Sequence, residues 1–204
     1  METPINTRTE QIGMALGEYL ARGDEKFEII NGKVMPSMPT LAYHNSLIHM
    51  IYSRLFMYFL LQQMVTGKAR IEATIIQPAR SNRNWVKGSY TPDVSVYLGT
   101  RLADYTAATP DWRERPFELI PDITIEVLSP TDQPQDIVKK IDAYLQLGVR
   151  EVVIVDAKTR HATRYLPGAE PVATAADSPD AALTFDDLLP GFALPLTELF
   201  DISE

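Results

Sequence analysis

The sequence predicts an α/β domain in which helices flank a mixed sheet, and three features of the chain indicate this fold class. An Asn31-Gly32 pair stands between two apolar segments and is a strong signal for a hairpin of antiparallel strands. A long segment with apolar residues at helical spacing comes next. Strands rich in β-branched residues then alternate with another amphipathic helix, so the predicted order is helix, hairpin, helix, strands, helix, strands.

The N-terminal elements are a helix, the hairpin and a second, longer helix. The first helix is expected over residues 9–21, and the hairpin pairs residues 27–30 with residues 33–35. The longer helix is expected over residues 41–64, and its core-facing stripe consists of Ile48, Ile51, Leu55 and Phe59. Polar residues interrupt this segment, so it is expected to be a buried helix and not a membrane span.

The remaining elements are strands around a third helix. Strands are expected over residues 69–77, 93–98 and 123–128, and the last two each begin next to a Pro-Asp pair, because proline suits the first position of a strand. A helix over residues 135–147 should end at Gly148. Strands over residues 151–156 and 160–165 then form another hairpin, and residues 167–182 form a surface loop or loose hairpin.

Length and composition indicate one intracellular domain. With 204 residues, 45% of them hydrophobic, the chain can bury a core without disulfides, and it contains no cysteine for a disulfide or thiolate metal site. The N-terminus lacks the apolar core of a signal peptide, so a cytoplasmic location is expected. Within a single domain over residues 1–204, we distinguish an N-terminal helix and hairpin (1–40), a core (41–165) and an acidic C-terminal extension (166–204).

The net charge of −8 is unevenly distributed along the chain. Residues 165–204 contain eight acidic residues and no Lys or Arg, so residues 1–164 are neutral overall. Residues 68–101 are locally basic, and the loop expected over residues 79–90 mixes cations with aromatic rings, a combination that can contact a phosphate backbone and exposed bases. The candidate DNA-binding residues are Arg80, Arg83, Trp85 and Lys87. An ordinary polar loop around a tucked-in tryptophan has the same composition.

Two carboxylates occupy strand positions where burial is costly. Glu126 alternates with Ile125 and Val127, and a carboxylate in mid-strand needs a cation, a metal or hydrogen bonds. Asp93 opens another strand after a proline, and neighbouring strands can bring both carboxylates together as a hard oxygen site that suits Mg²⁺ or Mn²⁺. Asp93 also has a structural interpretation, because Asp after Pro is a common turn or cap residue.

The helix over residues 135–147 directs one lysine toward these carboxylates. Lys140 lies at the edge of the apolar arc of this helix, about 60° from Ile137, whereas Lys139 points away. Asp136 lies one turn before Lys140 on the same side. Lys140 can therefore reach the carboxylates and offset the negative charge that develops during phosphodiester hydrolysis. A lysine at the helix edge that pairs only with Asp136 is the alternative.

These residues and their order resemble a known family. The pattern runs from Pro92-Asp93 through Glu126-Val127-Leu128-Ser129-Pro130 to Asp136, Lys140 and Tyr144. It resembles the Uma-type putative restriction endonucleases of the PD-(D/E)XK nuclease superfamily. Further segments similar to the family are the hairpin at residues 27–32, His44, Gly148-Val149, Val155-Asp156 and Leu189-Pro190-Gly191-Phe192.

The resemblance implies a restriction-endonuclease-like core that cleaves DNA with a divalent cation, Mg²⁺ or Mn²⁺. Asp93, Glu126 and the Val127 carbonyl would bind the cation, and Lys140 would complete the catalytic set. The superfamily usually has its lysine two residues after the glutamate, where this chain has Leu128. The family places the lysine on the following helix instead, which agrees with the helical position of Lys140.

Three other residues are candidates for supporting roles. Glu28 and His44 match family positions, as a supporting carboxylate and as a phosphate-binding or acid–base group, and Asp136 belongs to the same motif. A hydrogen-bonded structural histidine and a hairpin glutamate are the alternatives for the first two. The histidines of the chain lack the spacing of a zinc site.

Three hypotheses about function follow from the sequence. The leading one is a magnesium-dependent DNA endonuclease that works as a homodimer, because cutting two antiparallel strands suits a two-fold axis. The second keeps the fold without the chemistry, as a pseudo-nuclease that binds nucleic acid or another protein, consistent with Leu128 and the acidic C-terminal extension. The third is a small-molecule hydrolase or phosphotransfer enzyme, although the chain has no glycine-rich phosphate loop.

Overall fold

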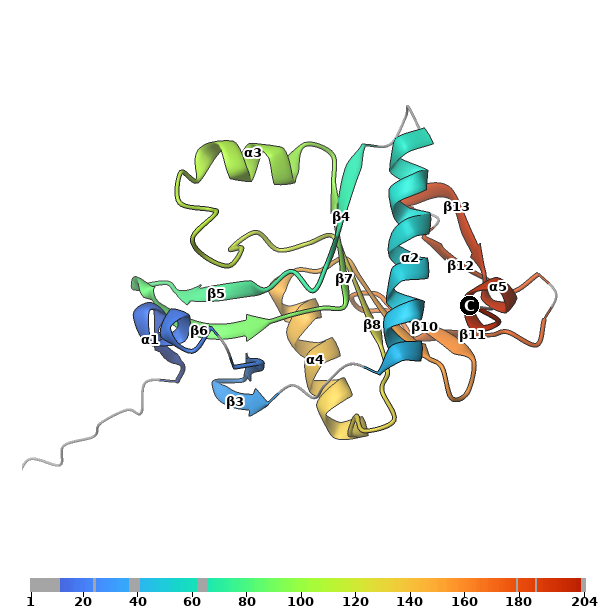
Figure 1. Cartoon of the computed structure of the whole chain (residues 1–204), viewed down its shortest axis with the longest axis horizontal. Helices are drawn as coiled ribbons and strands as arrows, with labels where there is room; N and C mark the ends of the chain where they lie inside the picture. The colour runs from blue at the N-terminus through green and yellow to red at the C-terminus, as the bar shows by residue number, and fades with distance from the viewer. Residues whose placement is uncertain are drawn as a thin grey trace, which may run out of the picture.

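The computed structural model describes residues 12–23, 25–36, 41–61, 66–178, 180–185 and 187–202, and its strands form three sheets (Figure 1). The central sheet has the strand order β11-β10-β9-β8-β7-β4. Its members are β4 (Gly67–Ile71), β7 (Val94–Leu98), β8 (Ile123–Val127), β9 (Glu151–Asp156), β10 (His161–Tyr165) and β11 (Val172–Ala175). Only β8 and β9 run parallel among these neighbours, so the sheet is mixed, as the sequence predicts.

A smaller antiparallel sheet lies beside the central one. It has the order β1-β6-β2-β3, with β5 also paired to β6. Its members are β1 (Met14–Ala15), β2 (Phe27–Ile30), β3 (Lys33–Pro36), β5 (Ile75–Ala79) and β6 (Asn82–Tyr90). Asn31 and Gly32 have φ values of 50° and 75° in the turn between β2 and β3, the backbone conformation that this residue pair favours. The predicted hairpin is therefore confirmed.

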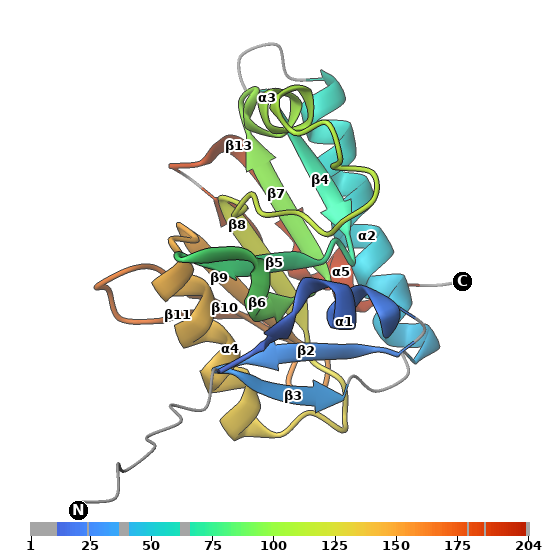
Figure 2. The same cartoon turned by 90° about the vertical axis from the view of Figure 1, so that its left-hand side faces the viewer.

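Helices cover both faces of the central sheet (Figure 2). The described helices are α1 (Leu16–Ala21), α2 (Ala42–Leu61), α3 (Arg101–Ala108), α4 (Pro134–Leu147) and α5 (Leu196–Phe200). The side chains of Ile123, Ile125 and Val127 on β8 belong to the same buried cluster as Leu47, Ile48 and Ile51 of α2. Glu126 alternates with them and faces α4, because a strand directs successive side chains to opposite faces.

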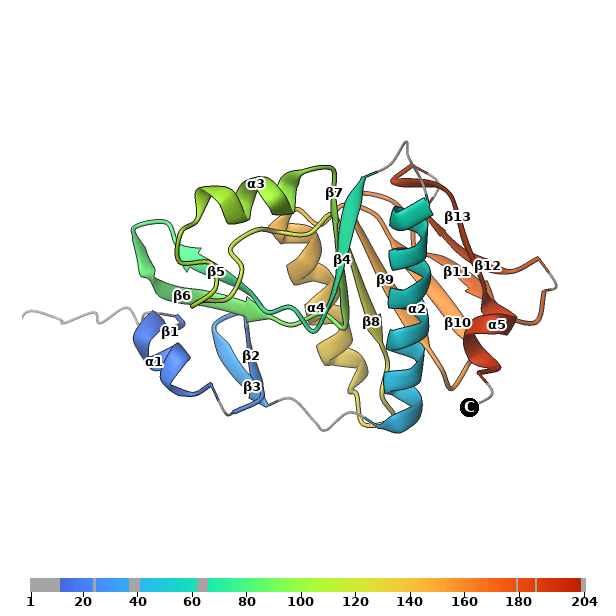
Figure 3. The same cartoon turned by 45° about the horizontal axis from the view of Figure 1, so that its top comes forward.

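The C-terminal elements extend the core on the α2 side (Figure 3). Strands β12 (Ala182–Phe185) and β13 (Leu189–Pro195) form a separate hairpin that is followed by α5. Their apolar side chains, including Phe185, Leu194 and Leu199, are buried against α2. The acidic extension thus contributes apolar residues to the same core. None of the described helices is long and apolar enough to cross a membrane.

Most of the predicted elements are confirmed, and three are wrong in extent or type. Helices α2 and α4 and the strands β7 to β10 lie where the periodicity predicts them. The first helix is shorter than predicted, because Met14 and Ala15 pair with β6 as the strand β1. Residues 9–11 of the first predicted helix and residues 62–64 of the second lie outside the described residues. Gly13 has a φ of 106°, and a Cβ there would lie 2.1 Å from the Val86 carbonyl oxygen, so the backbone must pass close to β6.

The other two errors concern residues 69–90. The strand predicted over residues 69–77 divides into β4 and β5, which belong to different sheets, and Glu72 between them has a φ of 45°. The loop predicted over residues 79–90 is mostly the strand β6, which pairs with β1, β2 and β5. Pairing on both sides stabilises β6 despite its polar sequence, an influence of tertiary structure that local composition does not reveal.

Candidate active site

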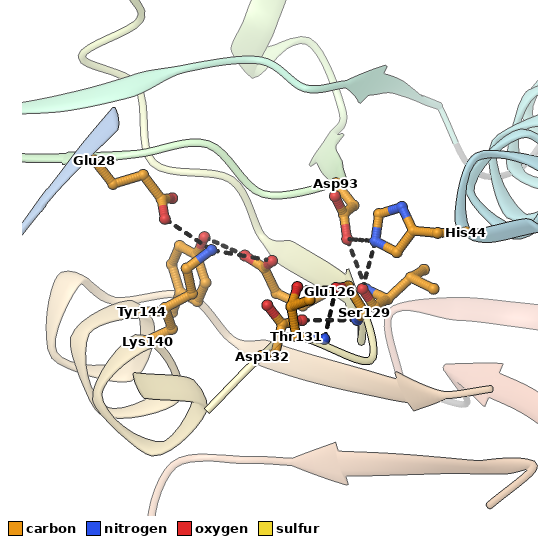
Figure 4. A network of polar contacts seen from close by, with 10 residues as sticks. Glu28, His44, Asp93, Glu126, Ser129, Thr131, Asp132, Lys140 and Tyr144 are labelled. Carbon is orange, nitrogen blue, oxygen red and sulfur yellow. Dashed lines mark hydrogen bonds and ion pairs between the residues drawn. The ribbon is translucent and has the colours of Figure 1, made fainter. Parts of the chain in front are cut away.

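Two carboxylates meet at one end of the central sheet (Figure 4). Strands β7 and β8 are antiparallel, and Val94 pairs with Ile125. Asp93, one residue before Val94, and Glu126, one residue after Ile125, are therefore neighbours across the two strands. The register that the sequence leaves open thus brings the predicted carboxylates together.

Asp93 and His44 are both tied to the backbone of Val127. The Val127 amide donates to Oδ2 of Asp93 at 2.7 Å, and Nε2 of His44, in the first turn of α2, donates to the Val127 carbonyl at 2.6 Å. Nε2 of His44 also lies 3.5 Å from Oδ2 of Asp93. Burial lowers the pKa of His44, but the Asp93 carboxylate, the Val127 carbonyl and the charge of Asp132 together outweigh burial, so the pKa is raised. The surroundings of His44 thus favour its protonated form.

Glu126 is held by two side chains of α4. Lys140 and Tyr144 are one helical turn apart and contact different carboxylate oxygens: the Lys140 ammonium lies 3.4 Å from Oε2, and the Tyr144 hydroxyl donates to Oε1 at 2.5 Å. Burial raises the pKa of Glu126 to about 8; the charge of Lys140 opposes this shift, and the carboxylates of Asp93 and Glu28 add to it. Burial thus favours the protonated form of Glu126, and Lys140 offsets this effect only in part.

Glu28 brings a third carboxylate from the smaller sheet. Its Oε2 lies 2.8 Å from the Lys140 ammonium, and its Oε1 accepts a hydrogen bond of 2.7 Å from the Thr91 amide. Burial would lower the pKa of Lys140, but Glu126 and Glu28 outweigh burial and raise it. Lys140 therefore keeps its positive charge between two carboxylates.

Within the described part of the chain, Asp136 does not contact Lys140 or the carboxylates of the cavity. The helical periodicity predicts it on the same side of the helix as Lys140, and the structure corrects this. Its Oδ1 pairs with the ammonium of Lys139 at 2.7 Å on the outer side of α4. The physical reason is that Lys140 is already held by Glu28 and Glu126, so the lysine three residues after Asp136 is left as its partner.

A cavity of about 430 Å³ opens beside these side chains. Glu28, His44, Asp93, Glu126 and Lys140 line it from the two sheets, α2 and α4. Two cations that sequence reasoning missed, Arg22 and Lys26, line it as well. They lie between α1 and β2, and no local pattern could place that turn over the end of the central sheet.

The predicted DNA-binding residues lie elsewhere. Arg80, Arg83, Trp85 and Lys87 belong to the β5–β6 hairpin and are not among the residues that line the cavity. Arg83 forms an ion pair with Glu118 at 3.1 Å. The indole of Trp85 donates to the Ile12 carbonyl at 2.9 Å, so this ring anchors the N-terminal segment against β6.

The site offers carboxylate oxygens, the kind of ligand that a hard divalent cation prefers. Glu28, Asp93 and Glu126 line the cavity together with Lys140, and the ammonium of Lys140 contacts Glu28 and Glu126. Among the residues that the structure describes, no group of three or more histidine or carboxylate side chains is arranged to hold a metal ion by itself. Mg²⁺ does not need one, because it is commonly bound by one or two carboxylates together with water and phosphate oxygens.

Comparisons with known proteins give a family and a fold. A family model described as "Uma2: Putative restriction endonuclease" matches residues 16–197. The fold is similar to the crystal structure of a putative nuclease of the DUF820 family from Anabaena variabilis, with a TM-score of 0.72. The two chains share 22% sequence identity, and the alignment covers 92% of this chain and 97% of the other. A comparison with curated proteins finds no match.

Proposed function

The chain belongs to the Uma2 family of putative restriction endonucleases, and we propose that it is a metal-dependent endonuclease that hydrolyses phosphodiester bonds of DNA. One observation carries this proposal: Asp93, Glu126 and Lys140 converge at one end of the central sheet and line the same cavity. Hard oxygen ligands beside a fixed positive charge are what phosphodiester hydrolysis requires. The charged lining also argues against a small-molecule enzyme, whose pocket would be mainly apolar.

We assign the binding of Mg²⁺ or Mn²⁺ to Asp93 and Glu126, with the Val127 carbonyl as a further oxygen ligand. The cation supplies Lewis-acid stabilisation of the phosphate and activation of water when it is bound. Lys140 stabilises negative charge on the phosphate oxygens in the transition state and offsets part of the charge of Glu126. The Nε2 proton of His44 is donated to the Val127 carbonyl beside Asp93, and His44 gives this proton to the leaving oxygen when substrate is bound.

In this proposal Lys140 of helix α4 takes the role of the lysine that the superfamily usually has two residues after the glutamate. Leu128 occupies the position two residues after Glu126, but the ammonium of Lys140 reaches Oε2 of Glu126 from α4. The positive charge is therefore kept in space while the motif in the sequence changes. We further propose that the protein acts as a homodimer, because a two-fold axis matches the symmetry of two antiparallel DNA strands.

Plasmid nicking tests the proposal. Supercoiled plasmid is incubated with the wild-type protein, Asp93→Ala, Lys140→Ala and Lys139→Ala, in Mg²⁺ or Mn²⁺. Nicking by the wild type should fall at least about 100-fold in Asp93→Ala and Lys140→Ala. Lys139→Ala is the matched control, since Lys139 pairs with Asp136 outside the cavity, and it should keep wild-type activity. Inert wild-type protein with both metals would favour a pseudo-nuclease that binds nucleic acid, and equal activity in all four proteins would indicate a contaminant.

A further inference from the structure

Among the described residues, Tyr144 is the one uncharged residue whose side chain donates a hydrogen bond to the Glu126 carboxylate. It lies on α4 one turn after Lys140, it is 0% exposed, and its hydroxyl donates to Oε1 of Glu126 at 2.5 Å. Lys140 contacts the other oxygen, Oε2. A lysine at the end of a flexible stem can follow a carboxylate that rotates, whereas a buried tyrosine hydroxyl fixes the position of the oxygen that it contacts.

The ring of Tyr144 is itself held firmly. It belongs to a buried cluster with Ile141, Val152 and Ile154, and its centroid lies 5.7 Å from that of Tyr90. The hydroxyl therefore has little freedom to move away from Glu126. Burial raises the pKa of Tyr144 well above its usual value, so the hydroxyl keeps its proton and remains a donor.

From this geometry we propose that Tyr144 is a positioning residue: its hydroxyl holds the Glu126 carboxylate in the orientation that binds a divalent cation together with Asp93. This inference rests on the proposed function, because it assumes that Glu126 is a metal ligand. Tyr144 is not among the residues that line the cavity, so its action runs through Glu126. Groups that orient metal ligands commonly change metal affinity without taking part in the chemistry.

Direct measurement of Mn²⁺ binding tests this role. Free Mn²⁺ is counted by electron paramagnetic resonance to give the dissociation constant, and plasmid nicking is titrated with Mn²⁺ to separate the half-saturating concentration from the maximal rate. Tyr144→Phe removes only the hydroxyl and should weaken Mn²⁺ binding by about tenfold. The half-saturating concentration should rise by the same factor, while the maximal rate at saturating Mn²⁺ changes much less.

Two further variants separate this role from a general loss of structure. Tyr90→Phe is the matched control, because it removes the hydroxyl of the neighbouring buried tyrosine and should leave Mn²⁺ affinity unchanged. Glu126→Asp retracts the carboxylate from the Tyr144 hydroxyl, so adding Tyr144→Phe to it should weaken Mn²⁺ binding no further. Thermal unfolding without metal checks that each variant folds.

The outcomes distinguish the inference from the proposed function. Wild-type Mn²⁺ affinity in Tyr144→Phe would overturn the positioning role and leave the nuclease proposal intact. Equal weakening in Tyr90→Phe, or full additivity in the Glu126→Asp background, would also overturn it. A wild-type protein that neither binds Mn²⁺ nor nicks DNA would overturn both.

Discussion

Lys140 lies closer to Glu28 than to Glu126: its ammonium nitrogen is 2.8 Å from Oε2 of Glu28 and 3.4 Å from Oε2 of Glu126. Glu28 belongs to the smaller sheet, whereas Glu126 belongs to the central one. The lysine therefore links the two sheets across the cavity. Lys140 thus shares its charge between the two carboxylates, and it opposes only in part the burial that raises the pKa of Glu126.

Glu28→Gln tests this link between the sheets. The amide oxygen can still accept from the Thr91 amide, but the ion pair with Lys140 is lost. Lys140 should then move toward Glu126, and stability should fall by about 1–2 kcal/mol, less than for a buried charge left without any partner. Urea unfolding measures the loss of stability, and plasmid nicking should fall by about tenfold as Lys140 becomes bound to the proposed metal ligand.

The control for Glu28→Gln is Glu25→Gln, which removes an exposed carboxylate that pairs with Arg22 at the rim of the cavity. This control should leave both the urea midpoint and nicking unchanged. Full stability and full activity in Glu28→Gln would show that the contact with Lys140 contributes nothing measurable.

The metal-free protein should lose stability as pH rises from about 5 to 8. Glu126 has a pKa of about 8 in the folded protein and an ordinary value in the unfolded chain. In this window the folded state holds a proton that the unfolded state has released, so the free energy of unfolding decreases with pH. Its contribution is complete below the unfolded pKa and is lost as pH passes the folded one.

Thermal unfolding at several pH values measures this slope. Glu126→Gln cannot release a proton, so its unfolding free energy should depend less steeply on pH over the same window. Adding Mg²⁺ or Mn²⁺ should stabilise the wild type most at pH 8, where the ionised carboxylate binds the cation, and should have little effect on Glu126→Gln. A wild type whose stability rises steadily from pH 5 to 8 would contradict the assignment of the raised pKa to Glu126.

Local patterns in the sequence predict the elements that carry the site, but not all of the contacts within it. The turn at Asn31-Gly32 and the arc of α4 depend on neighbouring residues alone, so the hairpin and the direction of Lys140 could be predicted. The pairing of Glu28 with Lys140 depends on how the smaller sheet lies on the central one, which no periodicity specifies. The pairing of Asp136 with Lys139 has the same origin, because it follows from what holds Lys140.

Tyr144 illustrates a signal that was present but ambiguous. Its position four residues after Lys140 on the apolar arc predicts burial, and a buried tyrosine hydroxyl usually finds a partner. Which partner it finds depends on the placement of β8 under α4. The break between β4 and β5 at Glu72 is a comparable case, since only the meeting of two sheets reveals it.

Thr124→Val should stabilise the protein. Thr124 lies on β8 on the same face as Glu126, it is 0% exposed, and its hydroxyl has no hydrogen-bond partner among the described residues. Valine has nearly the same shape without the polar group, so the substitution should raise the free energy of unfolding by about 1 kcal/mol. Urea unfolding measures the change. A loss of stability would indicate that the hydroxyl binds a buried water. The same test on Ser95, which pairs with Thr124 from the neighbouring strand β7, would locate that water.

Two substitutions of His44 distinguish a proton donor from a structural tie. Glutamine can place an amide near the position of Nε2 and keep the hydrogen bond to the Val127 carbonyl, but it has no proton to give. Alanine removes both. If His44 supplies a proton to the leaving oxygen, nicking should fall by about 100-fold in both variants, while stability falls by about 1 kcal/mol only in His44→Ala. Nicking at the wild-type rate in His44→Gln would assign His44 to holding the Val127 backbone, and with it the amide that donates to Asp93.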